Sequence, residues 1–251
     1  MCQTPSSALI IRDVRVFDGE RTYEHRNVLV ESGAIRRIGG TRLRVSKAEI
    51  VDGKGRTLLP GLFDAHVRVP VRPESALHEA ASLGITTVID MFGGGEKLKA
   101  EKRIEAEDPP NMADLRAAGF GATGPGSMLG TMMAKAPPPI ITGPEQAQSW
   151  VDARIAEGSD FIKVVYDERE GGPLTEETLQ EIVRAAHLRG RLVVVHVLAQ
   201  RKTQEAIAAG ADGLAHLYLG DSAEIWVIRP RFGGIRPSWA LGDWLRNIMY
   251  S

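Results

Sequence analysis

The chain has 251 residues, a formal net charge of −1, 43% hydrophobic residues and 25% charged residues. This is an ordinary globular composition, and a charge near zero gives no electrostatic reason to expect nucleic acid or an anionic membrane as a partner. The single cysteine, Cys2, excludes an intramolecular disulfide framework and a cysteine-rich zinc site. Since the sequence contains neither an apolar run of membrane-spanning length nor a secretory signal, we expect a cytoplasmic location.

Residues 8–58 show the pattern of short strands separated by turns. Apolar residues alternate at Ile10, Val14 and Val16, and Asp-Gly and Ser-Gly pairs such as Asp18-Gly19 mark turns between the runs. No helical period interrupts this stretch. We therefore predict a small antiparallel β unit at the start of the chain.

From Pro60 onward, apolar runs alternate with helical segments, which predicts βα units in a parallel sheet. The expected strands are 58–66, 85–91, 117–124, 160–167, 191–197 and 213–217, and the expected helices with recognisable ends are 141–158, 173–190 and 202–213. We expect Thr142, Thr175 and Thr203 to cap these helices. Residues 222–251 hold three of the four tryptophans and show no clear period, although 239–250 suits one helix.

Polar residues gather at the expected carboxyl ends of these strands, where parallel α/β sheets place their sites. They are Asp64, His66, Arg68, Asp90, Lys163, His196 and His216. Imidazole nitrogen is a good zinc ligand, so three histidines on one rim indicate a candidate hydrolytic metal centre. Each histidine taken alone also suits an ordinary hydrogen-bonded rim residue, and Asp64 and Asp90 suit turn caps. Lys163 lies within an apolar strand, where a lysine is costly unless it is paired or neutral.

Three segments resemble the amidohydrolase superfamily, in its imidazolonepropionase-like and prolidase-like branch. They are VDGKGRTLLPGLFDAHVRV, GSDFIKVVYDE and RLVVVHVLAQRKTQEAIAAGADGLAHL, which follow one another in the family's order. The resemblance implies a metal-dependent hydrolase of non-peptide amide, cyclic amide or dipeptide bonds. It implies one or two divalent ions, zinc above all, and a small-molecule substrate. The implied metal ligands are His66, Lys163 in carboxylated form, His196 and His216.

Further roles follow from the same resemblance. Lys163 and His216 are expected to be catalytic, and Arg68 and Tyr166 are expected to contact substrate. The implied fold is a partial (β/α)8 barrel of about six βα units over residues 60–221. A partial β-sandwich at 1–59 precedes it, and an atypical tail at 222–251 follows.

The sequence departs from the family pattern at two places. Arg68 occupies the position of the second strand-one histidine, and a guanidinium has no lone pair with which to bind a metal. No match to the family's strand-eight aspartate, its general base, is found. These departures leave open an inactive family member. The lysine at 163, within an apolar strand, also leaves open a Schiff-base lyase in which Lys163 attacks a carbonyl. An incomplete barrel also has open edges, which predicts a homo-oligomer.

Overall fold

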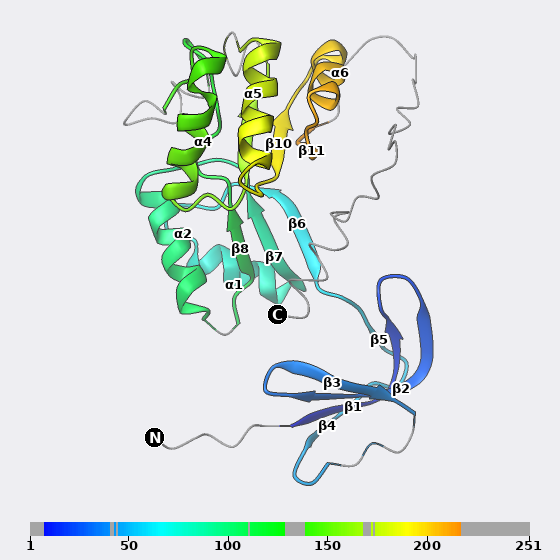
Figure 1. Cartoon of the computed structure of the whole chain (residues 1–251). Coiled ribbons are helices and arrows are strands. Elements are labelled where there is room, and N and C mark those ends of the chain that lie inside the picture. Colours follow the sequence, from blue (N-terminus) through cyan, green and yellow to red (C-terminus); the bar gives the residue numbers. More distant parts are fainter. Residues whose placement is uncertain are drawn as a thin grey trace. The chain divides into compact units, whose positions relative to one another are not determined.

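The computed structural model describes residues 8–40, 43, 45–109, 111–128, 139–167, 172 and 174–216 (Figure 1). These residues form two compact units, which divide between Pro60 and Gly61. The expected tail at 222–251 and Cys2 lie outside the described residues. None of the helices in the described residues has the length and apolarity needed to cross a membrane.

The first unit is a single five-stranded sheet. It contains β1 (Leu9–Phe17), β2 (Thr22–Glu31), β3 (Ala34–Gly39), β4 (Glu49–Asp52) and β5 (Thr57–Leu58). The antiparallel pairing predicted here is confirmed for β1 with β2 and for β2 with β3. It is wrong for β4 and β5, which both pair with β1 in parallel. Local alternation predicts that a segment is a strand, but long-range pairing decides its direction.

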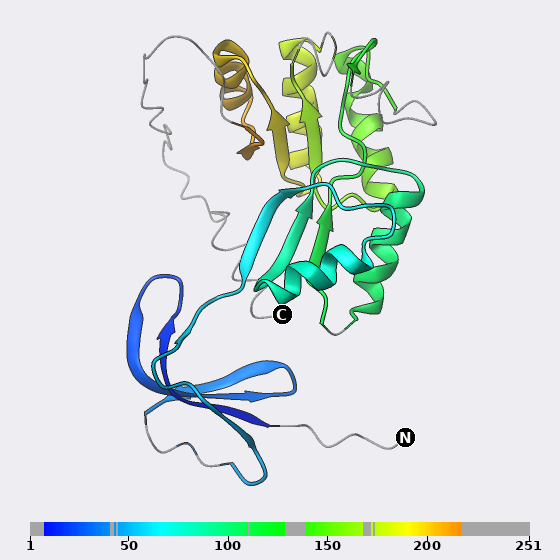
Figure 2. The same cartoon turned by 180° about the vertical axis from the view of Figure 1, so that it is seen from behind.

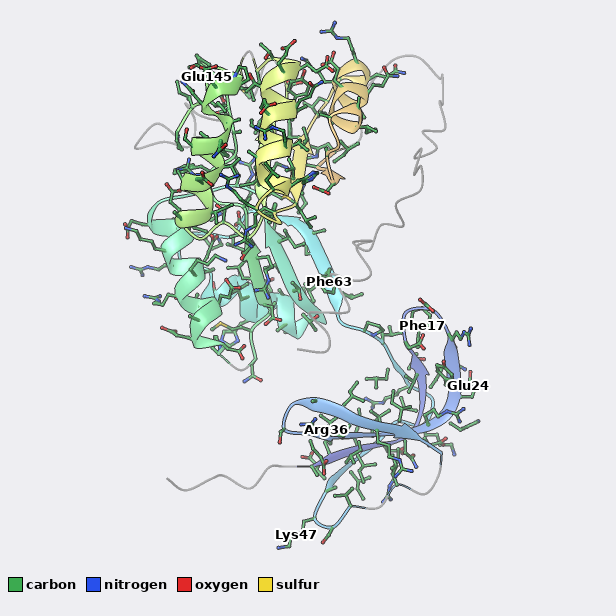
Figure 3. All side chains as sticks on the ribbon, viewed as in Figure 1. Phe17, Glu24, Arg36, Lys47, Phe63 and Glu145 are labelled. Atoms are coloured by element: carbon green, nitrogen blue, oxygen red, sulfur yellow. The ribbon has the colours of Figure 1, made fainter. Side chains whose placement is uncertain are left out.

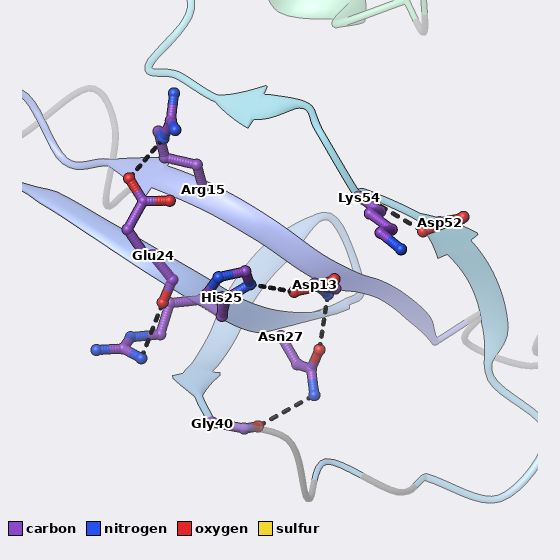
Figure 4. A network of polar contacts seen from close by, with 9 residues as sticks. Asp13, Arg15, Glu24, His25, Asn27, Gly40, Asp52 and Lys54 are labelled. Carbon is purple, nitrogen blue, oxygen red and sulfur yellow. Dashed lines mark hydrogen bonds and ion pairs between the residues drawn. The ribbon is translucent and has the colours of Figure 1, made fainter.

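Two non-glycine residues with a positive φ of 52° mark irregularities where β1 pairs with β2. They are Asp13 and His25, and the Asp13 carboxylate lies 2.7 Å from His25 Nδ1. The Asp13 backbone N–H donates to Asn27 Oδ1 at 3.0 Å, and Asn27 Nδ2 donates to the Gly40 carbonyl at 3.0 Å (Figure 4). This network satisfies polar groups of the sheet, so His25 has a structural role.

The second unit is built from parallel strands and helices. Its strands are β6 (Leu62–Val67), β7 (Ile85–Asp90), β8 (Asp114–Ala117), β9 (Ile162–Val165), β10 (Val193–His196) and β11 (Gly213–Leu214). They pair in parallel in the orders β6-β7-β8 and β11-β10-β9, and an isolated parallel bridge between Ala122 and Val164 connects the two groups. The predicted parallel pairing is thus confirmed. The third strand was expected at 117–124 but covers 114–117, since the glycines that follow form a loop.

The helices of this unit are α1 (Glu74–Ser82), α2 (Glu96–Glu107), α4 (Ala147–Ala156), α5 (Glu176–His187) and α6 (Gln200–Ala208), together with the short η1 (Pro144–Gln146). They alternate with the strands along the chain (Figures 1 and 2). The largest buried cluster lies between α4 and α5 on one side and β9 and β10 on the other, and it includes Val151, Ile182, Val164 and Val195. Figure 3 shows the side chains on the helices and strands of this unit. The core therefore fixes β9 and β10, the strands that carry Lys163 and His196.

One of the three expected helix caps is confirmed. Thr175 precedes α5 with an extended backbone and accepts a hydrogen bond from the Thr178 N–H at 3.2 Å. Thr142 is not a cap, because Gly143 takes that position before η1. Thr203 is not one either, because α6 starts three residues earlier and the Thr203 hydroxyl donates to the Ala199 carbonyl within the helix.

Candidate metal centre

Four strands of the second unit, or the residues just after them, carry the side chains that the sequence singled out. His66 lies near the end of β6, Lys163 lies within β9, His196 ends β10, and His216 follows β11 by two residues. Lys163 pairs with Val194 in the β9–β10 register, so Lys163 and His196 face the same side of the sheet. Parallel pairing brings the strand ends to one rim.

The three imidazoles of this rim lie in direct contact. The ring centres of His66 and His216 are 4.8 Å apart, and those of His196 and His216 are 4.7 Å apart with the rings nearly perpendicular. Three histidines separated by as many as 150 residues in sequence thus meet at one point of the fold. The structure brings together the candidates that the sequence proposed.

Lys163 lies beneath this rim in an apolar setting. Its side chain is 3% exposed, and its ammonium donates to Met91 Sδ at 3.7 Å, which is its one polar contact with a side chain among the described residues. Burial, followed by the nearby positive charge of Arg68, lowers the pKa of Lys163 from 10.5 to about 7. At physiological pH, Lys163 is therefore a neutral amine in a large fraction of the protein molecules.

Two of the histidines, His66 and His196, are also held in the neutral state. Burial, then the charges of His216 and Lys163, lower the pKa of His196 to about 4. Burial and the charge of Lys163 likewise lower the pKa of His66. A neutral imidazole keeps a lone pair for a metal ion, whereas an imidazolium does not.

Arg68 and Tyr166, the two expected substrate contacts, differ in placement. Arg68 is exposed, and its guanidinium carbon lies 5.6 Å from the centre of the Phe92 ring beside the rim. Tyr166 is buried in the helix-facing cluster, and its hydroxyl donates to Glu205 Oε2 at 2.7 Å. Since Lys163 points to the opposite face of the strand, the structure does not bring Tyr166 to the rim, and we do not carry it into the site.

The remaining candidates have structural contacts. Asp64 accepts a hydrogen bond from the His66 backbone N–H at 3.3 Å, in keeping with a turn cap. His78 Nδ1 lies 2.7 Å from the Asn111 carbonyl oxygen, and His187 Nε2 lies 2.9 Å from an Asp212 carboxylate oxygen. These two helix histidines thus stabilise connections between elements away from the rim.

Sequence reasoning missed two charged residues near the site, Lys97 and Glu101 on α2. The Lys97 side chain is 12% exposed and that of Glu101 is 1% exposed, and the Lys97 ammonium lies 2.5 Å from a carboxylate oxygen of Asp90. Their spacing of four residues in a highly charged helix is typical of a solvated ion pair, so the sequence offers no signal of their burial.

The donor chemistry of the rim fits a divalent metal. Two imidazoles on one tetrahedral zinc place their ring centres about 5 Å apart, given metal–nitrogen bonds of about 2.0–2.1 Å, and the observed separations are close to this. As the side chains stand, no group of three or more His, Cys, Asp or Glu residues in the described part of the chain is arranged to hold an ion. Ring spacing and residue type therefore fit a metal, although the described side chains do not stand as a finished ligand set.

Solved structures with a similar fold include several hydrolases. A prolidase in complex with N-methylphosphonate-L-proline matches with a TM-score of 0.69 and 20% identity over 83% of this chain, and a Xaa-Pro dipeptidase with bound methionine matches with 0.68 and 21% over 83%. The ochratoxinase of A. niger matches with a TM-score of 0.67 and 18% identity over 84%. The chain spans 60%, 61% and 60% of these three structures, so it matches about three fifths of their length.

Sequence comparison gives two further matches. The dihydroorotase of Streptomyces coelicolor is 36% identical over 92 residues, which cover 34% of this chain and 20% of that enzyme. The profile of the amidohydrolase family matches residues 57–229, which include every residue of the rim. The chain belongs to the amidohydrolase family.

Proposed function

We propose that this chain is a metal-dependent hydrolase that cleaves the carbon–nitrogen bond of a small amide, cyclic amide or dipeptide. The observation that carries the proposal is the convergence of His66, His196 and His216 above a buried lysine on one rim. Family membership supports a hydrolase, and the structural neighbours include a prolidase and a dipeptidase. The substrate class is our inference for this chain.

We also propose that strands β6–β11 form six of the eight strands of a (β/α)8 barrel, over residues 60–221. Their parallel pairing and their alternation with helices support this architecture. The stretch 1–59 would then be part of a β-sandwich. Association of two copies through the outer edges of β6 and β11 is a further proposal, since no strand of the described residues pairs with these edges.

His66, His196 and His216 would hold the metal through neutral imidazole nitrogens. Lys163 would join them as a carbamate: its neutral amine attacks the carbon of carbon dioxide, a nitrogen–carbon bond forms as one carbon–oxygen π bond breaks and leaves its electron pair on oxygen, and the nitrogen loses a proton to solvent. The carbamate would be an anion, so the apolar strand β9 would supply a negatively charged ligand for the divalent cation. A bound divalent ion supplies Lewis acidity that activates water and polarises a carbonyl.

Arg68 has a different part in this proposal. A permanent cation cannot bind a metal, and its charge opposes a second ion at this position, so we propose a single ion. The guanidinium lies exposed beside the rim, over the Phe92 ring, where it suits a substrate carboxylate. No residue of the sequence matches the family's strand-eight aspartate, so we assign no general base.

The test is hydrolysis of Xaa-Pro dipeptides, N-acyl amino acids and dihydroorotate, with zinc and bicarbonate present. We expect activity that a chelator abolishes and that His196→Ala removes. His187→Ala, which changes an exposed helix histidine paired with Asp212, is the matched control and keeps activity. A higher KM with an unchanged kcat in Arg68→Ala supports the carboxylate contact.

Two outcomes would overturn the proposal. Folded protein without any metal-dependent hydrolysis would support the inactive family member instead. Borohydride trapping of a carbonyl substrate on Lys163 in metal-free protein would support the Schiff-base lyase.

A further inference from the structure

A cluster of buried charged residues lies near the rim and takes no part in the chemistry proposed above. Its members are Asp90 at the end of β7 and Lys97 and Glu101 on α2. Asp90 and Glu101 are each 1% exposed, and the Lys97 ammonium lies 2.5 Å from Asp90 Oδ2 and 3.4 Å from Glu101 Oε1. Burying such charges costs desolvation free energy, so a cluster of this kind is weak evidence of a stabilising role.

The Asp90 carboxylate joins the ends of two strands. Its Oδ2 accepts a hydrogen bond from the Val69 backbone N–H at 2.7 Å, and its Oδ1 accepts one from the Phe92 N–H at 3.0 Å. Val69 follows Arg68 directly and His66 by three residues. The carboxylate therefore restrains the segment that presents both His66 and Arg68 to the rim.

The two residues after Asp90 contact the site from below. The Met91 sulfur accepts from the Lys163 ammonium at 3.7 Å. The Phe92 ring, 1% exposed, lies 5.6 Å from the Arg68 guanidinium carbon. A Cβ atom built on Gly121 would lie 2.8 Å from the Phe92 ring and 3.2 Å from Lys163 Cγ, so ring and lysine stem pack around the same glycine.

Lys97, on α2, contacts the segment Asp90–Phe92 at both of its ends. Besides its ion pair with Asp90, its ammonium donates to the Phe92 carbonyl at 2.9 Å. Gly93 leaves the space for it, because a Cβ at that position would lie 2.7 Å from Lys97 Cδ and 2.9 Å from Lys97 Nζ. The lack of a side chain at Gly93 therefore gives the Lys97 side chain the room it occupies beside this segment.

We propose that Asp90 and Lys97 are positioning residues of the candidate metal centre, which hold the His66–Val69 and Met91–Phe92 segments against Lys163. The inference rests on the proposed function for its effect on metal binding. Its structural part, the restraint of two strand ends by one ion pair, can be measured without metal.

The experiment compares Lys97→Met and Asp90→Asn with wild-type protein by amide hydrogen exchange and by zinc titration calorimetry. We expect peptides covering 67–72 and 90–95 to exchange at least about tenfold faster in both variants. The reason is that the ion pair is lost which holds the Asp90 carboxylate against the Val69 and Phe92 N–H groups and the Lys97 ammonium against the Phe92 carbonyl. We expect zinc affinity to fall by about tenfold to a hundredfold, as for other residues that orient ligands.

Two controls separate positioning from general destabilisation. Lys99→Met removes an exposed lysine of the same helix that pairs with Glu96, so it should change neither measurement. Thr175→Ala removes the N-terminal cap of α5 and leaves the buried core intact, so it should lower stability while leaving zinc affinity within twofold of wild type. If Lys97→Met does not fold, Asp90→Asn, which keeps the shape of the side chain, carries the test.

The outcomes are distinct. Wild-type exchange at 67–72 and 90–95 in the two cluster variants would overturn the inference, as would an equal loss of zinc affinity in Thr175→Ala. A wild-type protein that binds no zinc would overturn the proposed function, and the exchange measurement alone would then decide the role of the ion pair.

Discussion

Replacing Lys163 with methionine should stabilise the metal-free protein, and the gain should shrink as the pH rises. Methionine is apolar and of similar length, so it fits the buried position without a charge. Burial lowers the pKa of Lys163 from 10.5 to about 7 in the folded chain. Between these two values only the unfolded state holds the proton, so the unfolded state binds more protons and the wild-type free energy of unfolding rises with pH across this window.

The size of the effect follows from the same numbers. At roughly 1.4 kcal/mol per pKa unit, the lysine penalises the fold by about 4 kcal/mol at pH 7 and about 2 kcal/mol at pH 9. Urea unfolding followed by circular dichroism, in chelator and degassed buffer, measures the difference between wild type and Lys163→Met at both pH values. We expect the advantage of the variant to fall by about 2 kcal/mol over this range. Lys99→Met, at an exposed lysine, should show no such trend.

The reasoning would be refuted by a Lys163→Met variant that is less stable than wild type by the same amount at both pH values. That result would mean that the folded protein pairs the charged ammonium, and that the lysine is not kept neutral.

Four further substitutions test other parts of the account. Thr175→Ala should lower the free energy of unfolding by about 1 kcal/mol, since it removes the cap of α5, while Thr142→Ala should leave urea unfolding unchanged. Leu77→Ala, at a fully buried residue of the α1 core, should cost about 2–5 kcal/mol in the same assay, and a smaller loss would contradict the packing described. Arg68→His should strengthen zinc binding in calorimetry, because it exchanges a repelling cation for a ligand; weaker binding would contradict the site.

Strands β6, β7, β9 and β10 could be predicted from sequence because each is a short, largely apolar run. Of these, β7 and β10 end in a polar residue, and the lysine in β9 was noticeable because its neighbours are apolar. The third strand was misplaced because β8 begins with Asp114 and the following glycine-rich segment resembles a continuing strand. The direction of β4 and β5 depends on pairing with β1, which no local pattern encodes.

Side-chain environment was harder to predict than strand position. Tyr166 continues the apolar run of β9, but its alternation places it on the helix-facing side, opposite Lys163. Lys97 and Glu101 have the spacing of a surface ion pair, and their burial depends on the space left by Gly93 and on the carboxylate of Asp90. Such partners come from other elements, so the helix sequence alone does not reveal them.

The central claim is that the three imidazoles and Lys163 form a metal centre. The most direct test is the metal content of folded protein, measured by elemental analysis after incubation with zinc and bicarbonate and removal of free metal. The account predicts about one zinc ion per chain in wild type, and its loss in His196→Ala but not in His187→Ala. Folded wild-type protein that retains no more zinc than His196→Ala would contradict it.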